Sequence, residues 1–83
     1  MPQPRHPDLV VLGRAIRAIR DEHGLTASGL AAASGVPESS IAALEDGRLD
    51  ADFELLLDIA TGLGVRPAEL FVRAEELAAR AGP

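Results

Sequence analysis

The spacing of apolar residues constrains this 83-residue chain more than any other feature of its sequence. Within residues 9–23, one face of a helix collects four apolar side chains, namely Leu9, Leu12, Ile16 and Ile19. Gly24 follows as the residue that ends this helix. No segment alternates between apolar and polar residues over the length of a strand. The sequence therefore predicts an all-α protein, built from five short helices.

A tight turn separates the second and third predicted helices. Thr26 is a good N-cap for the second helix, residues 27–33, whose buried face would consist of Leu30, Ala31 and Ala33. Ser34, Gly35 and Val36 form the turn, and Pro37 occupies the first position of the third helix, where its missing N–H costs nothing. This third helix spans residues 37–46, buries Ile41 and Leu44, and ends at Gly47.

Two further helices follow a short loop at residues 48–51. Asp52 caps the fourth, which Gly62 and Gly64 end and whose apolar stripe comprises Phe53, Leu56, Ile59, Ala60 and Leu63. Pro67 opens the fifth, with a stripe comprising Leu70, Ala74, Leu77 and Ala78. A chain of this size has room for one domain. We expect residues 1–7, with three prolines, to form a flexible arm, and residues 8–83 to form a single domain whose last helix is extended at the C-terminus.

Composition excludes several classes of site. Cysteine is absent, which removes disulfides, thiolate zinc sites and cysteine nucleophiles. His6 and His23 do not have the spacing of metal ligands, and no nucleophile, base and orienting acid can be assembled, so we expect no metal, no cofactor and no enzymatic activity. No apolar run approaches the roughly 20 residues that span a bilayer, and the N-terminus lacks a signal-peptide core. The expected location is the cytoplasm, without a membrane partner.

The charge balance argues against general nucleic-acid binding. Thirteen acidic residues outnumber eight basic ones, which are all arginine, and the formal net charge is −5. Tyrosine and tryptophan are absent and only two phenylalanines are present, so the chain lacks platforms on which single-stranded bases stack. Any nucleic acid that it binds is expected to be double-stranded DNA.

Two helices joined by a short glycine turn are the arrangement of a helix-turn-helix unit, whose second helix enters the major groove. The register of LGRAIRAIRDEHGLT, LAAASGV, SSIAALEDGR and LLLDIATGLGVRPAELF resembles the XRE-type helix-turn-helix family, typified by lambda and P22 repressors and by restriction-modification controller proteins. The resemblance covers about residues 12–71 and implies a five-helix, lambda-repressor-like DNA-binding domain. It also implies an ion pair between Arg20 and Glu45, which would tie the first helix to the recognition helix.

The sequence departs from this family at the positions expected to lie on DNA. The family usually has glutamine at position 27, polar or basic residues at 38, 39 and 43, and a basic turn at 48–51. Here those positions hold Ala27, Glu38, Ser39, Ala43 and Arg48-Leu49-Asp50-Ala51. From Thr26 to Gly47 there is no basic residue, and there are three acidic ones, Glu38, Glu45 and Asp46.

The candidate DNA contacts are accordingly few. Arg14, Arg17 and Arg48 could contact phosphates, as could backbone N–H groups at the helix starts near Thr26, Ala27 and Pro37. Base reading would fall to four residues of the third helix, Glu38, Ser39, Ser40 and Ala43. A carboxylate can accept from cytosine N4, but Glu38 is equally well placed to favour the helix dipole. Arg14 and Arg17 could equally belong to a solvated helix face.

The last helix continues beyond the part of the chain that resembles the family. We expect a homodimer that uses this helix, with Leu70, Phe71 and Leu77 as interface residues. The alternative is that these side chains complete the core of the monomer.

Two functional hypotheses follow. The first is a sequence-specific, double-stranded DNA-binding transcriptional regulator that acts as a homodimer on a palindromic operator. The alternative is a helix-turn-helix fold used as a protein-interaction module, such as an antitoxin or the partner of a regulator, with weak or lost DNA binding. The acidic recognition segment favours this alternative, in which the partner is another protein.

Overall fold

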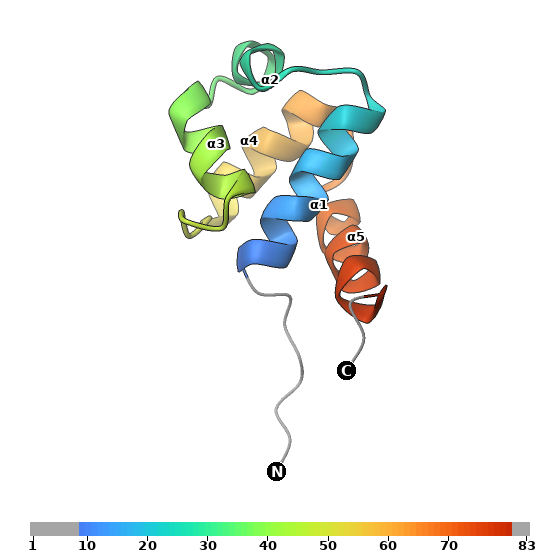
Figure 1. The fold of residues 1–83 in the computed structure, drawn as a ribbon. Coiled ribbons are helices and arrows are strands. Elements are labelled where there is room, and N and C mark those ends of the chain that lie inside the picture. The colour runs from blue at the N-terminus through green and yellow to red at the C-terminus, as the bar shows by residue number, and fades with distance from the viewer. Residues whose placement is uncertain (1–8, 81–83) are drawn as a thin grey trace.

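Five helices make up the part of the chain that the computed structural model describes, residues 9–80 (Figure 1). In chain order they are α1 (Leu9–Glu22), α2 (Ala27–Ser34), α3 (Glu38–Glu45), α4 (Phe53–Leu63) and α5 (Pro67–Arg80). No strand occurs in this range. The predicted all-α fold of five helices is therefore confirmed. The predicted arm, residues 1–7, lies outside the described residues.

The helices enclose one apolar core. Figure 1 places α2 at the top of the view and α5 at the bottom, and α1 packs against both α3 and α5. Each helix contributes one large, fully buried side chain, and these five are Ile16, Leu30, Ile41, Ile59 and Leu70. Burial of such a side chain contributes about 1.5–3 kcal/mol relative to leaving it in water. The core thus fixes the position of α3 from its inner side.

The two predicted N-caps are present, and the start of α3 differs from the prediction. The Thr26 hydroxyl accepts a hydrogen bond of 2.9 Å from the Gly29 N–H, and the Asp52 carboxylate accepts one of 2.8 Å from the Leu55 N–H. Pro37, predicted as the first helical residue, is instead the N-cap of α3, with φ of −56° and ψ of 141°. Its extended ψ is the conformation of a capping position, and the helix begins at Glu38.

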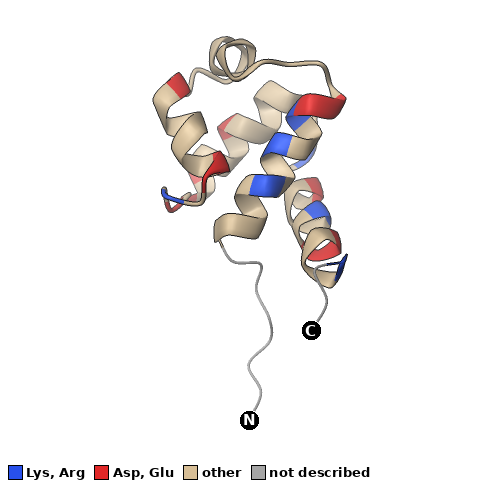
Figure 2. Ribbon diagram, viewed as in Figure 1, with Lys and Arg blue, Asp and Glu red and all other residues tan. Residues whose placement is uncertain are grey.

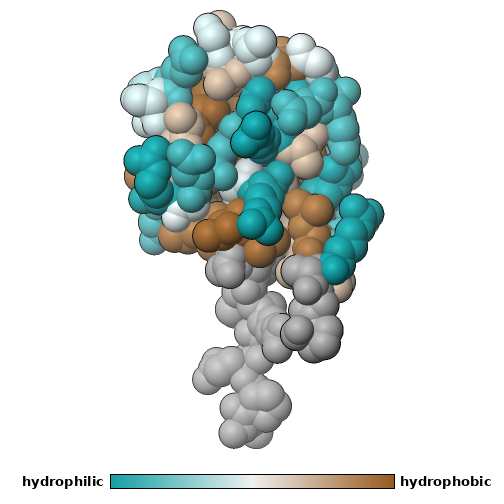
Figure 3. All heavy atoms as spheres, in the orientation of Figure 1, coloured by the Kyte–Doolittle hydropathy of each residue, from teal (hydrophilic) through white to brown (hydrophobic). Residues whose placement is uncertain are grey.

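Three residues that were predicted to face the core are exposed. Leu9 is 38% exposed and Phe53 is 73% exposed, although both follow the apolar spacing of their helices. Each is the first residue of its helix, and the spacing indicates the face of a helix but not how far along it the core extends. Ala33 is also exposed, because α2 buries only Leu30. Figure 3 shows apolar surface, in brown, at the lower end of the molecule where α1 begins.

Two glycines allow helices to approach closely. Gly62 was predicted to end α4, but the helix continues through it to Leu63, and Gly64 ends it with a φ of +75°. A Cβ at Gly62 would lie 2.7 Å from the Cβ of Ser34 in α2. In α1, a Cβ at Gly13 would collide with the Leu44 carbonyl and lie 2.8 Å from the Glu45 carbonyl oxygen. The backbone at the end of α3 therefore rests directly on α1.

An ion pair also joins α1 to α5. Arg73 donates two hydrogen bonds to the Glu22 carboxylate, of 2.6 and 3.0 Å, and these hydrogen bonds lower the pKa of Glu22. Both side chains reach solvent, so the pair adds little to stability compared with the core.

We predict that Gly13→Ala destabilises the protein by about 1–3 kcal/mol, because the added methyl group meets backbone atoms of α3 that cannot rotate away. Helix propensity alone would have the opposite effect, since alanine is favoured over glycine in a helix by about 1 kcal/mol. Urea unfolding followed by circular dichroism measures the change. An equal or higher free energy of unfolding would show that α1 and α3 are not in backbone contact.

Candidate nucleic-acid interface

The connection between α2 and α3 is a three-residue turn that hydrogen bonds anchor to α2. Gly35 adopts a left-handed φ of +76°, and its N–H donates to the Ala31 carbonyl at 2.9 Å. The Ser34 hydroxyl donates to the Leu30 carbonyl at 2.7 Å and accepts from the Val36 N–H at 3.2 Å. Val36 is only 5% exposed and belongs to the core. These hydrogen bonds and the burial of Val36 therefore fix the angle between the two helices.

The predicted pair between Arg20 and Glu45 is present and ties the end of α3 to α1. Arg20 Nε donates to Glu45 Oε2 at 2.6 Å, and Nη2 donates to Oε1 at 2.9 Å. The remaining nitrogen, Nη1, donates to the Leu25 carbonyl at 2.8 Å. The two side chains are 11% and 9% exposed. The hydrogen bond with Glu45 raises the pKa of Arg20, so the guanidinium remains charged.

The outer surface of the helix-turn-helix unit carries the residues predicted to contact DNA. Glu38 and Ser39 are exposed at the start of α3, while Ser40 and Ala43 are partly exposed. At the start of α2, Thr26 is exposed and Ala27 is partly exposed, and Pro37 is exposed in the turn. The inner side of α3 is occupied by Ile41 and Leu44, which are buried. One side of α3 is thus fixed and the other is open to a ligand.

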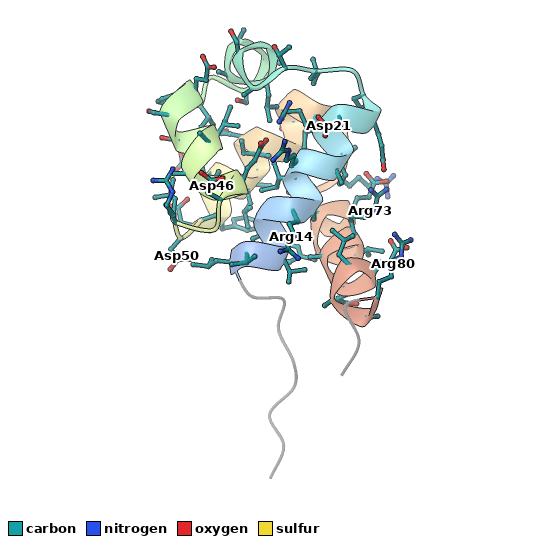
Figure 4. The ribbon with its side chains drawn as sticks, in the orientation of Figure 1. Arg14, Asp21, Asp46, Asp50, Arg73 and Arg80 are labelled. Atoms are coloured by element: carbon teal, nitrogen blue, oxygen red, sulfur yellow. The ribbon has the colours of Figure 1, made fainter. Side chains whose placement is uncertain are left out.

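The acidic residues of the segment from Thr26 to Gly47 have different surroundings. Glu45 is nearly buried and bound by Arg20. Asp46 accepts a hydrogen bond of 3.1 Å from Arg48, and Figure 4 shows Asp46 at the end of α3. Glu38 has neither a hydrogen bond nor an ion pair from its side chain to any of residues 9–80. Of the three carboxylates, only Glu38 is unpaired within the described chain.

Arginines suited to phosphate contact lie on α1. Figure 2 shows basic positions along the face of α1 that is turned to the viewer, beside α3. Arg14 and Arg17 are both exposed, and within residues 9–80 neither side chain forms an ion pair. Arg48 is held by Asp46, but both side chains are more than half exposed, and such a pair contributes little. A phosphate could therefore replace Asp46 as the partner of Arg48.

The residues proposed for a dimer interface differ in their exposure. Leu70 is fully buried in the core of the chain, so it has no surface to offer a second copy. Phe71 is 40% exposed, and Leu77 is partly buried against the core. Val72 is 55% exposed beside Phe71, and the sequence reasoning did not include it among the interface residues. The position of Val72 next to Phe71 on the extended last helix was the sequence feature that could have identified it as an interface residue.

Other kinds of site find no support in residues 9–80. No cluster of histidine, aspartate and glutamate there is placed to hold a metal ion. None of the helices in that range is long and apolar enough to cross a membrane. An open cleft of about 270 Å³ lies between the end of α1 and α5, but its central charges, Glu22 and Arg73, bind each other.

Comparison with known proteins identifies the fold. The model of a family described as a helix-turn-helix domain matches residues 11–71. The restriction-modification controller protein C.AhdI from Aeromonas hydrophila is 35% identical, with a TM-score of 0.74 over 76% of this chain and 96% of that one. The clp gene regulator ClgR from Corynebacterium glutamicum is 33% identical, with a TM-score of 0.80 over 96% and 84%. The controller protein C.Esp1396I is 25% identical, with a TM-score of 0.80 over 87% and 94%. No curated protein sequence matches this chain.

We predict that Glu45→Gln lowers the free energy of unfolding by about 3–5 kcal/mol, because it removes the hydrogen-bonded counter-charge of the nearly buried Arg20 guanidinium and leaves only the exposed Asp21, 3.5 Å from Nη1. Glu54→Gln removes the same charge from an exposed position on α4 and should leave stability nearly unchanged. Chemical denaturation of both variants makes the comparison. A loss of less than about 1 kcal/mol for Glu45→Gln would place the pair with ordinary surface ion pairs.

Proposed function

Since the chain belongs to the helix-turn-helix domain family, we propose that it is a transcriptional regulator that binds double-stranded DNA as a homodimer on a palindromic operator. The observation that carries the proposal is the arrangement of α3, whose inner side is locked by the core and by Arg20 while its outer side is open. The similar solved proteins are a gene regulator and controller proteins rather than enzymes, which supports the same class.

Affinity in this proposal comes from the flanks of α3 rather than from its own side chains. Arg14 and Arg17 of α1 have no competing carboxylate within residues 9–80, so they can neutralise phosphates without breaking an ion pair. Arg48 supplies a third contact from the loop after α3. Backbone N–H groups at the starts of α2 and α3 donate to phosphates without any side-chain charge, which suits a chain with net charge −5.

The alternative, a protein-interaction module without DNA binding, was favoured by the acidic recognition segment. That support is weaker once the side chains are placed, because Glu45 is nearly buried and bound by Arg20, which leaves Glu38 and Asp46 as the exposed carboxylates of the segment, and Asp46 is paired with Arg48 in the free protein. DNA binding is therefore the function that the surface supports best.

Dimerisation is proposed to use the exposed apolar side chains of α5. Phe71 and Val72 are adjacent and exposed, and Leu77 lies one to two turns further along the same helix. Symmetric dimers of helix-turn-helix proteins bind half-sites about 34–36 Å apart, and this is the spacing expected for the two copies of α3.

The test of DNA binding is selection of duplexes from a random pool at about 50 mM salt, followed by a salt titration on the selected sequence. We expect a two-fold symmetric motif. Arg14→Ala combined with Arg17→Ala should reduce the magnitude of the salt slope by about 3–4, because the dimer loses four phosphate contacts of about 0.9 each.

The matched control is Arg66→Ala combined with Arg80→Ala, which removes the same charge from exposed positions of α5 and of the residues before it. This control should leave the slope nearly unchanged. Enrichment of no motif at low salt would refute DNA binding and direct the search to a protein partner. Equal effects of the two double variants would show that net charge, and not contact by α1, sets the slope.

For the dimer, Phe71→Ser should convert the protein to a monomer in sedimentation velocity, because it replaces a half-exposed apolar ring at the proposed interface. Phe53→Ser, at the more exposed phenylalanine on α4, should leave the association state unchanged. A wild-type protein that sediments as a monomer at every concentration, or a dimer that survives Phe71→Ser, would rule out this interface.

A further inference from the structure

We propose that Glu38 is the residue by which α3 selects a cytosine in each operator half-site. The inference rests on the proposed function and deepens it by naming the base that is read and the side chain that reads it. Glu38 is the first residue of α3 and is exposed. N-terminal residues of a recognition helix are those that reach base edges in the major groove.

The first step of the argument is that Glu38 has no structural task within residues 9–80. Its carboxylate makes no hydrogen bond there and faces no arginine within ion-pair distance. Pro37 caps α3 without any side-chain hydrogen bond, so Glu38 does not take part in a capping arrangement. The favourable effect of a carboxylate on the helix dipole remains, but it does not require the side chain to be held in place.

The second step is that no other acidic side chain lies at the N-terminal end of α3. Glu45 is bound by Arg20, and Asp46 and Asp50 lie beyond the C-terminal end of α3, so Glu38 is the single carboxylate in the first turn of the recognition helix. A lone carboxylate in a groove lined by phosphates is repelled unless a hydrogen-bond donor receives it. Glu38 therefore disfavours binding to most sequences and favours binding only where a donor is present.

The third step concerns the donors that the major groove offers. An ionised carboxylate only accepts hydrogen bonds. Guanine presents two acceptors there and thymine presents an acceptor and a methyl group, so neither can pair with it. Cytosine presents the N4 amino group as a donor with no acceptor on the same base edge, whereas adenine places an acceptor, N7, beside its amino group. Cytosine is the base that suits Glu38 best.

The fourth step is that α3 offers no competing reader. Its sequence, ESSIAALE, contains no arginine, lysine, asparagine or glutamine, the side chains that recognise guanine or adenine. Ser39 and Ser40 can donate or accept and discriminate little, and Ala43 can contact only a thymine methyl group. Discrimination between bases by α3 is therefore concentrated at the position that faces Glu38.

The experiment is parallel DNA selection with the wild type, Glu38→Gln and Glu38→Ala, followed by affinity measurements on single-base variants of the selected site. The wild type should require a C·G pair at one symmetric position of each half-site and lose about tenfold in affinity per half-site when that pair is replaced. Glu38→Gln should shift the preference at that position from cytosine to adenine, because glutamine pairs with adenine N6 and N7. Glu38→Ala should lose the preference there and bind non-specific DNA more tightly.

Glu54→Gln is the matched control, since Glu54 is an exposed glutamate that carries the same charge in the first turn of α4, one position further into its helix than Glu38 is in α3. It should select the wild-type motif. A wild-type motif that Glu38→Gln and Glu38→Ala leave unchanged would overturn the role of Glu38 while the proposed function stands. Selection of no motif by the wild type would overturn both, and a motif change in Glu54→Gln as well would assign the effect to net charge rather than to base reading.

Discussion

The geometry of the surface proposed to face DNA depends on the bond between Arg20 and Glu45. The guanidinium uses all three of its nitrogens, two on Glu45 and one on the Leu25 carbonyl, so it joins α1, the loop before α2 and the end of α3 at one point. Gly13 makes this possible, because any larger residue there would push the end of α3 away from α1. A hydrogen-bonded ion pair at this depth has directional preferences that apolar contacts lack, and it orients α3 about its own axis.

Much of the fold could be predicted from the sequence because local physical rules govern it. Caps at Thr26 and Asp52, the turn at Gly35 and the end of α4 at Gly64 all follow from the conformational preferences of single residues. The errors arose where a non-local fact decides. Gly62 looked like a helix end, but it is a contact between α4 and α2 that only the packed structure reveals. Leu9 and Phe53 follow the apolar spacing and yet lie beyond the reach of the core.

The candidate site could be predicted less completely, because the sequence gives the number of charged residues but does not show which of them form ion pairs. Counted without their partners, the three acidic residues of the recognition segment argue against DNA binding. The resemblance to a known family identified the partner of Glu45, but the hydrogen bond between Arg48 and Asp46 had no counterpart in the sequence reasoning. Leu70 was predicted at the dimer interface but is buried in the core of the chain. A stripe of apolar residues on the last helix does not show which of them pack inside the chain and which remain exposed for a second copy. Pairing and burial are properties of the fold.

A recognition helix without cations requires that affinity and specificity come from different parts of the molecule. In the proposed complex, phosphate contacts from α1 and from backbone N–H groups hold any sequence equally well, so they set how tightly the protein binds but not where. With a net charge of −5, this attraction is modest and cannot mask an unfavourable contact in the groove. In the role proposed for it, Glu38 acts chiefly by rejection, because every site that lacks a donor opposite this residue leaves a desolvated charge without a partner. Weak phosphate contacts, together with one strongly unfavourable contact at Glu38 on most sequences, would make the protein selective with very few contacts.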